Sequence, residues 1–175
     1  MKLDIKKIIK PTISLFVICL LTTTFLAVTS ALTEKKILER AEQDINATRK
    51  IVLSTADTFE EVKDNAVVGK DENGNIVGHV ITVTIKGYGG NMQVMVGIDS
   101  DEKVSGVSIL SHSETPGLGA KAADDGFLSQ FKGINSEAEV GVEIDSISGA
   151  TISSAAVTDA VNKALNEYIT EVKSE

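Results

Sequence analysis

Four hydroxyl side chains gather at the start of an expected helix near the end of the chain. The segment EIDSISGATISSAAVTDA, Glu143 to Ala160, carries Ser148, Thr151, Ser153 and Ser154 around the pair Gly149 and Ala150. A helix entrance offers unpaired backbone N–H groups and a partial positive charge, so it stabilises an oxygen acceptor or a phosphate. N-capping by Ser148, Thr151 or Ser153 contributes about 1 kcal/mol. Capping explains one hydroxyl and leaves the others without a role.

A second stretch whose residue types could form a functional site is SHSETPGLGAKAADDGF, Ser111 to Phe127. It follows an expected strand and combines a carboxylate and a hydroxyl with three glycines and a proline, which break regular structure. Such a loop can bring backbone amides close to a flat or anionic ligand. A surface turn after an edge strand is the alternative. A nucleotide-triphosphate loop is not supported, because GLGAK lacks the Walker spacing and its Ser or Thr.

Other chemistries lack the residues they need. The one cysteine, Cys19, can form neither an intramolecular disulfide nor a CxxC pair, so redox chemistry requires a bound cofactor. The two histidines, His79 and His112, fit no metal-ligand spacing, and we predict no metal site. We interpret His79 as a strand residue at a sheet margin. A serine or threonine hydrolase would lack a base partner and a Gly-x-Ser-x-Gly elbow.

The amino-terminal part of the chain has the composition of a membrane anchor. Residues 11–32 contain no charged side chain, and roughly 20 apolar residues suffice to cross a bilayer. We predict a transmembrane helix over 11–32, with its threonine hydroxyls bonded back to helix carbonyls. Four lysines in residues 1–10 place that segment in the cytoplasm and the rest of the chain outside. A cleavable signal peptide, with small residues near Ala27 to Ala31, is the alternative and also exports the domain.

The net charge disfavours a nucleic-acid partner. It is −8 overall, and the first ten residues contribute +3, so the remainder carries about −11. Nucleic-acid binding needs clustered Lys and Arg.

The remaining pattern predicts an α+β domain. Residues 33–56 place apolar side chains at helical spacing and predict a membrane-proximal helix, with the stripe Ile37, Leu38, Ala41, Ile45, Thr48, Ile51 and Val52. Residues 57–175 then form one domain. From Phe59 to Ile109 the apolar period is two, with Val77, His79, Ile81, Val83 and Ile85 on one face. The Asn-Gly turn in Asp71 to Asn75 predicts a hairpin. The sheet should be largely antiparallel.

Two helical segments complete this prediction. Phe127, Leu128 and Phe131 indicate a short helical segment. The last helix should run from about Ile152 to Val172, with one apolar face formed by Val157, Ala160, Val161, Ala164, Leu165 and Tyr168. The helices are expected to flank the sheet.

A family resemblance is carried by two motifs, DSISGATISS and SETPGLGAK. Two shorter stretches between the anchor and these motifs, GYGG and VGID, extend it. The chain resembles the FMN-binding domain of the G subunit of the Rnf electron-transport complex and of the C subunit of the Na+-translocating NADH:quinone reductase. The resemblance covers nearly the whole chain. It implies covalent FMN, with its phosphate esterified to Thr151 by a flavin transferase that uses FAD and Mg2+. Asp145, Ser148 and Gly149 belong to the pattern which that transferase recognises.

The resemblance also implies how the cofactor is held. Gly149 and Ala150 leave room for the ribityl chain, and Ser153 and Ser154 are helix caps or phosphate contacts. The ring is flanked by Glu114, Thr115, Leu118 and Gly119. Since the chain has no tryptophan, we expect the ring to pack on aliphatic side chains such as Leu118 and on loop backbone.

The expected function is that of a redox subunit in an ion-translocating ferredoxin:NAD+ oxidoreductase complex in the cell membrane, not of a complete enzyme. The 143 residues after position 32 favour the Rnf type, because they are few for the quinone-reductase subunit. A freestanding flavin carrier at the cell surface remains an alternative, as does an anchored binding module without flavin.

Overall fold

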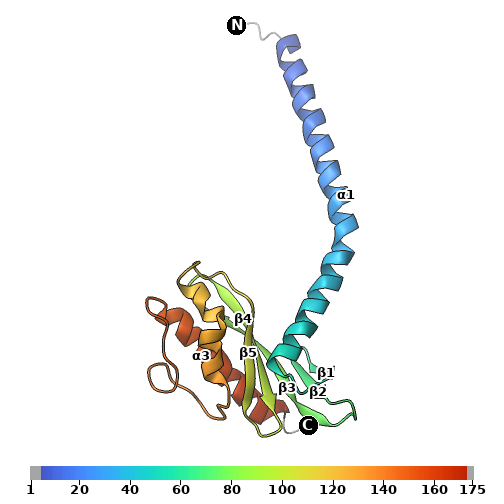
Figure 1. The fold of residues 1–175 in the computed structure, drawn as a ribbon. Helices are drawn as coiled ribbons and strands as arrows, with labels where there is room; N and C mark the ends of the chain where they lie inside the picture. Colours follow the sequence, from blue (N-terminus) through green and yellow to red (C-terminus); the bar gives the residue numbers. More distant parts are fainter. Residues whose placement is uncertain (1–4, 173–175) are drawn as a thin grey trace. The chain divides into compact units, whose positions relative to one another are not determined.

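A computed structural model describes residues 5–172 of the chain (Figure 1). The chain divides into two compact units, Met1–Asp44 and Ile45–Glu175. The second unit contains the whole sheet and both stretches that the sequence marks for chemistry.

One continuous helix, α1 (Ile5–Val52), runs through the two helical segments expected at 11–32 and 33–56. It begins before Pro11 and ends four residues before the expected boundary. Within it, Ile9–Glu34 is long and apolar enough to cross a membrane by length and composition. The hydroxyls of Thr23 and Thr24 donate to the carbonyls of Cys19 and Leu20, at 2.8 and 2.7 Å. This back-bonding satisfies the hydroxyls within the helix, as predicted.

The sheet has five antiparallel strands in chain order (Figure 1). They are β1 (Thr58–Lys63), β2 (Ala66–Lys70), β3 (Ile76–Lys86), β4 (Asn91–Asp99) and β5 (Val104–Ser111). The predicted hairpin at Asp71 to Asn75 joins β2 to β3, and the Asp71 carboxylate accepts hydrogen bonds from the N–H groups of Asn73 and Asn75. The antiparallel sheet is therefore confirmed.

Strand β3 departs from the sequence prediction at two positions. His79 pairs with Val68 and Ile98 in the middle strand of the sheet, so its assignment to a sheet margin is wrong. Val77 packs against the opposite face from Ile81, because the register of β2 and β3 shifts between Gly69 and Lys70. An extra residue in one strand reverses the alternation beyond it.

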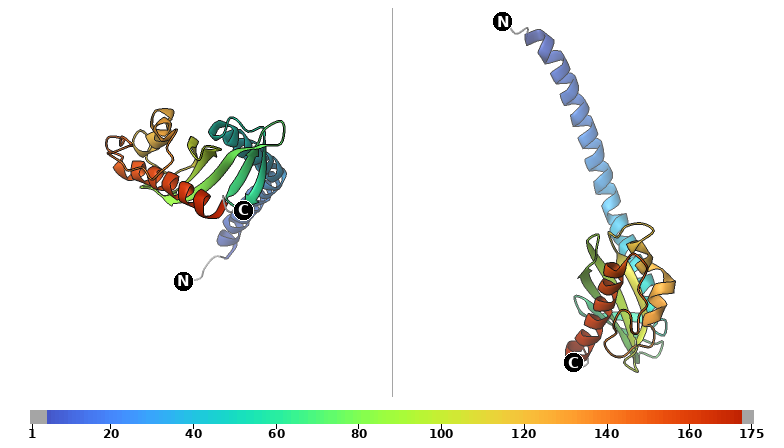
Figure 2. Two further views of the ribbon diagram at one scale, coloured as in Figure 1. Left: turned by 90° about the horizontal axis from the view of Figure 1, so that it is seen from below. Right: turned by 90° about the vertical axis from the view of Figure 1, so that its left-hand side faces the viewer.

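Helix α3 (Thr151–Glu167) covers one face of the sheet (Figure 2). It begins one residue before its predicted start and continues as a π-helix, η3 (Tyr168–Val172). All the residues of its predicted apolar face are buried: Val157, Ala160, Val161, Ala164, Leu165 and Tyr168. They pack on Ile81, Val83, Val94 and Val96 of the central strands.

The other face of the sheet is covered by the end of α1 and the residue after it. Val52 and Leu53 are buried against Val80 and Met95, so β3 and β4 are covered on both faces. The Val52 carbonyl accepts a hydrogen bond of 2.5 Å from the Ser105 hydroxyl. Ile51 is 71% exposed, so the expected stripe does not hold at this residue.

Three short helices link β5 to the segment before α3. They are η1 (Gly119–Ala123), α2 (Asp125–Leu128) and η2 (Ser129–Phe131). The last two confirm the predicted helical segment, and their aromatic rings at Phe127 and Phe131 are buried with an edge-on contact, 5.6 Å between centroids. This contact anchors the end of the glycine-rich stretch to the core.

Candidate functional site

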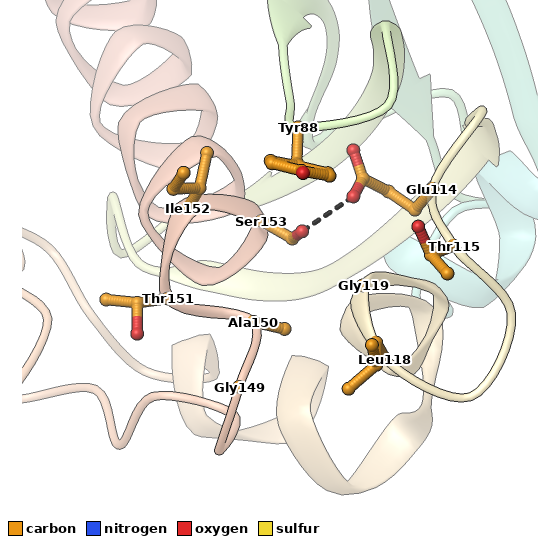
Figure 3. Close-up of a pocket in the computed structure, with 10 residues that line it drawn as sticks. All are labelled: Tyr88, Glu114, Thr115, Leu118, Gly119, Gly149, Ala150, Thr151, Ile152 and Ser153. Carbon is orange, nitrogen blue, oxygen red and sulfur yellow. Dashed lines mark hydrogen bonds between the residues drawn. The ribbon is translucent and has the colours of Figure 1, made fainter.

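A pocket of about 420 Å³ lies between the glycine-rich loop and the start of α3 (Figure 3). It is lined by Tyr88, Glu114, Thr115, Leu118, Gly119, Gly149, Ala150, Thr151, Ile152 and Ser153. The fold thus brings the two stretches singled out in the sequence to one place. Of the predicted residues, Ser148, Ser154 and Asp145 do not line the pocket; Ser148 is exposed and adjoins Gly149.

The glycine-rich loop winds tightly around Thr115. The Thr115 carbonyl accepts hydrogen bonds from the N–H groups of Leu118 and Ala120, at 3.2 and 3.1 Å. Gly117 has φ +78°, in the left-handed region that favours glycine. Leu118 emerges from this turn 48% exposed, and a Cβ atom added at Gly149 of the neighbouring segment would lie 3.4 Å from its Cδ2.

The start of α3 has no side-chain cap. Its N-cap residue is Ala150, and neither a capping hydrogen bond nor an acidic first-turn residue is present there. The expectation that a hydroxyl residue caps this helix is therefore wrong. Because the first N–H groups of a helix have no intrahelical acceptor, this end remains suited to an anionic ligand. Thr151, the first helical residue, is exposed.

The other two hydroxyls of this turn are buried and engaged elsewhere. Ser154 accepts from the N–H of Ile147 at 3.0 Å and donates to the carbonyl of Ala150 at 3.1 Å. It therefore braces the segment before α3 from inside and is not a phosphate contact, contrary to expectation. Ser153 turns toward Glu114, while Thr151 lies on the opposite side of the helix start (Figure 3).

The Glu114 carboxylate joins three segments at the wall of the pocket. It accepts a hydrogen bond of 3.0 Å from the N–H of Gly89, in the turn between β3 and β4. It accepts another, of 2.6 Å, from the Ser153 hydroxyl. The backbone N–H of Glu114 donates a hydrogen bond of 3.2 Å to Nδ1 of His112. The side chain is 6% exposed. One carboxylate thereby connects the loop, the strand turn and α3.

Burial alone raises the pKa of Glu114, whereas the hydrogen bonds from Ser153 and Gly89 lower it. Backbone hydrogen bonding at Tyr88 and the electrostatic influence of His112 act in the same direction, and together these lowering effects outweigh that of burial. The pKa therefore lies below its ordinary value of 4.5, and the group is a carboxylate at neutral pH.

Gln130 holds the segment that leads into the pocket. Its Oε1 accepts a hydrogen bond of 2.8 Å from the N–H of Asp145, and its Nε2 donates one of 3.4 Å to the Asp145 carbonyl. With Ser154 holding Ile147 and Ala150, the segment from Asp145 to Ala150 is fixed near both ends. Sequence reasoning missed Gln130, because its partner lies fifteen residues away.

Exposed apolar side chains border the pocket. Tyr88 is 70% exposed, Ile152 58% and Leu118 48%. Exposed apolar groups clustered around a concave site are typical of a ligand or partner surface. Tyr88 and Ile152 were not predicted; the signal for Tyr88 was a lone aromatic between the glycines of GYGG. Among the side chains described by the structure, no group of three or more His, Cys, Asp or Glu could hold a metal ion.

This site lies within a recognised class of domain. The family described as FMN-binding domain matches residues 87–166, which include every residue that lines the pocket.

Relatives extend the similarity to nearly the whole chain. The G subunit of the ion-translocating oxidoreductase complex of Methanosarcina acetivorans is 38% identical, over 93% of this chain and 95% of the relative. The corresponding G subunits of two ferredoxin:NAD(+) oxidoreductase complexes, proton-translocating in Clostridium ljungdahlii and Na(+)-translocating in Acetobacterium woodii, are 33% and 34% identical. They are matched over 95% of this chain and over 95% and 94% of their own lengths. The chain belongs to the family of these G subunits.

Solved structures share the fold. The C subunit of the Na(+)-translocating NADH-quinone reductase from Parabacteroides distasonis superposes with a TM-score of 0.50 at 24% identity, over 63% of each chain. NqrC of Shewanella oneidensis gives 0.52 at 19% identity, over 70% of this chain and 73% of that one. The predicted α+β fold of an FMN-binding domain is thus confirmed.

Proposed function

We propose that this chain is the flavin-carrying electron-transfer subunit of a membrane-bound, ion-translocating ferredoxin:NAD+ oxidoreductase complex of the Rnf type. The observation that carries the proposal is the similarity to G subunits of such complexes over 93–95% of the chain. The chain acts as one redox subunit and not as a complete enzyme. Residues 11–32 hold no charged side chain, and an ion pathway through a membrane usually needs one.

The pocket suits FMN in shape and chemistry. The exposed apolar side chains of Tyr88, Leu118 and Ile152 can pack on a flat ring, with Thr115 and Gly119 beside it. The uncapped N-terminus of α3 can receive the phosphate, and Gly149 and Ala150 have little bulk to obstruct the ribityl chain. When bound, the flavin supplies the electron-transfer chemistry that the side chains of this protein lack.

We infer that the phosphate is esterified to Thr151. This side chain is exposed on the first turn of α3, in the pocket lining, where the helix end favours the phosphodiester. A flavin transferase makes the ester by transferring the FMN moiety from FAD with Mg2+, and releases AMP. Asp145, Ser148 and Gly149 are the part of the pattern that the transferase contacts. The exposure of Ser148, outside the pocket, agrees with a role in this recognition.

The test is mass spectrometry of the full chain, exported from a host that expresses a flavin transferase. The peptide containing Thr151 should gain the mass of FMN minus water, and Thr151→Ala should abolish the gain. Thr170→Ala, which changes a threonine at the far end of the α3–η3 helix, is the matched control and should retain it. An unmodified wild-type peptide would overturn covalent attachment and favour an anchored module without covalent flavin.

We also propose that residues 11–32 remain as a transmembrane helix, with residues 1–10 in the cytoplasm and the FMN domain outside. Apolar side chains along this stretch, including Phe25 and Leu21, are 74% and 64% exposed, as suits contact with lipid. An intact mass that includes residues 1–32, and activity of a C-terminal alkaline phosphatase fusion, are the expected results. Loss of residues 1–32 would identify a cleaved signal peptide.

A freestanding flavin carrier on the cell surface is the second candidate function, favoured by the exposed apolar border of the pocket. Co-purification separates the two functions. A subunit of the complex is recovered with polytopic membrane proteins after mild detergent extraction, whereas a freestanding carrier is recovered alone. The similarity to the C subunit of the quinone reductase is a likeness of fold, so it gives that alternative less support than the similarity to G subunits.

A further inference from the structure

Glu114 lies in a space that the backbone leaves for it. A Cβ atom added at Gly87 would lie 2.3 Å from its Oε1, and one added at Gly119 would lie 2.3 Å from its Oε2. These glycines come from the turn after β3 and from the glycine-rich loop. Two separate segments therefore lack side chains where the carboxylate needs room, and this room places the carboxylate in the pocket wall.

The carboxylate is stabilised by hydrogen bonds rather than by an ion pair. Its oxygens accept from the Gly89 N–H and the Ser153 hydroxyl, and among the side chains that the structure describes no Lys or Arg forms a salt bridge with it. The negative charge is thus only partly balanced, by the dipoles of its hydrogen-bond donors. Burying a carboxylate without a cation is costly, so its position in a ligand pocket favours an electrostatic role.

We propose that the negative charge of Glu114 sets the reduction potential of the flavin in this pocket, and that Ser153 tunes the strength of this charge. The inference rests on the proposed function, because it requires FMN at Thr151. Glu114 acts as a fixed charge, and Ser153 is a positioning residue that acts through it.

The sign follows from electrostatics. Addition of electrons to a flavin ring makes it more negative, and a fixed negative charge in a wall of low dielectric opposes this. Glu114 therefore holds the midpoint potential low. The Ser153 hydroxyl dipole points its positive end at the carboxylate and partly offsets the charge. Removal of Glu114's charge and removal of Ser153's hydroxyl should shift the potential in opposite directions.

The experiment is a spectroelectrochemical titration of the exported full chain in detergent, with FMN on Thr151 verified by mass spectrometry. Glu114→Gln keeps the size and most hydrogen bonds of the side chain, and its potential should shift to more positive values. Ser153→Ala should shift the potential to more negative values. Asp159→Asn removes an equal charge from an exposed position of the same helix and should leave the potential unchanged.

The pH dependence separates charge from packing. The difference between wild type and Glu114→Gln should be constant at neutral pH and close only well below pH 4.5, as the wild-type carboxylate takes up a proton. An unchanged potential in flavinylated Glu114→Gln overturns the proposal, as does a shift of the same sign in both variants or a difference that persists in acid. If Glu114→Gln does not fold, the direction in which Ser153→Ala shifts the reduction potential decides whether the proposal holds. If the wild-type protein carries no FMN on Thr151, the proposed function itself is overturned.

Discussion

The hydroxyl of Ser153 donates a 2.6 Å hydrogen bond to the carboxylate of Glu114, across 39 positions of the sequence. Ser153 is 2% exposed and Glu114 6%. The bond joins the first turn of α3 to the glycine-rich loop, so each of the two segments that form the pocket orders the other. Hydrogen bonds to a charged acceptor are stronger than neutral ones, and the donor of this one is buried.

Removal of this hydroxyl should destabilise the domain. Ser153→Ala is expected to lower the free energy of unfolding by about 1.5–3 kcal/mol, the range for hydrogen bonds to charged groups. Urea unfolding of the unflavinylated full chain in detergent measures it. Ser129→Ala, at an exposed position, is the control and should change little. Equal stabilities of Ser153→Ala and wild type would show that the bond contributes nothing.

The same pair predicts an acid sensitivity. Since the folded pKa of Glu114 is depressed, its contribution to stability is present above the unfolded value of 4.5 and is lost as pH falls through the folded pKa. The Ser153 hydrogen bond is a cause of this depression, so Ser153→Ala should lose less stability on acidification. Unfolding free energies at neutral pH and below pH 4.5 test this. A parallel loss in both proteins would contradict it.

Close packing of glycine backbone against the end of α1 gives another prediction. A Cβ atom at Gly97 would lie 2.2 Å from the Val52 carbonyl oxygen, and Gly97 pairs with Gly106, which faces the same residue. Gly97→Ala should therefore destabilise the domain by about 1–3 kcal/mol through overpacking. The matched control is Gly126→Ala, because nothing lies within 4 Å of a Cβ there. Thermal unfolding of both variants measures the difference, and equal effects would contradict it.

Periodicity was sufficient to predict the sheet and the last helix. The alternation from Phe59 to Ile109 and the Asn-Gly turn specify local geometry, and the strands and the hairpin appear as predicted, except that Val77 lies on the other face of β3. The second covered face of the sheet was not predictable, because Val52 and Leu53 meet Val80 and Met95 only after folding. Contact with a neighbouring element produces no periodic pattern in the sequence of the strand that it covers.

The candidate site was likewise only partly predictable from the sequence. Motifs located the pocket, since Glu114, Leu118, Gly149 and Thr151 all line it. The assignment of Ser154 as a cap or phosphate contact was wrong because its partners, Ile147 and Ala150, are set by the turn before α3. The part of Gln130 was missed for a similar reason. The sequence indicates which side chains can form hydrogen bonds, but the fold determines their partners.

His79 predicts a loss of stability in mild acid. Its Nδ1 is a buried atom for which the described chain offers no hydrogen-bond partner, and its ring stacks at a tilt on Tyr168, 5.3 Å between centroids. Burial lowers its pKa below 6.5. Stability should be retained above pH 6.5 and decline as pH falls from 6.5 toward the lowered folded pKa, because the unfolded chain binds the proton more readily.

The substitution His79→Phe tests this dependence. It removes both the titrating group and the unpaired nitrogen while keeping a ring to pack on Tyr168, so its melting temperature should stay level over that pH window. The wild-type melting temperature should fall there. Melting curves of the full chain at several pH values between about 8 and about 5 provide the measurement. A decline of equal size in His79→Phe would assign the effect to other groups.

Gln130 should control how fast the chain accepts its flavin. It fixes the backbone of Asp145 through two hydrogen bonds, at the start of the segment that leads to Thr151. Without them the segment samples more conformations, so fewer encounters with the transferase are productive. Gln130→Ala should therefore slow flavin attachment, seen as slower growth of the flavin-modified mass in a time course with purified transferase, FAD and Mg2+. Gln43→Ala, exposed on α1, is the matched control and should react at the wild-type rate. If Gln130→Ala is folded and reacts as fast as wild type, the transferase does not depend on a preformed segment and must order it on binding.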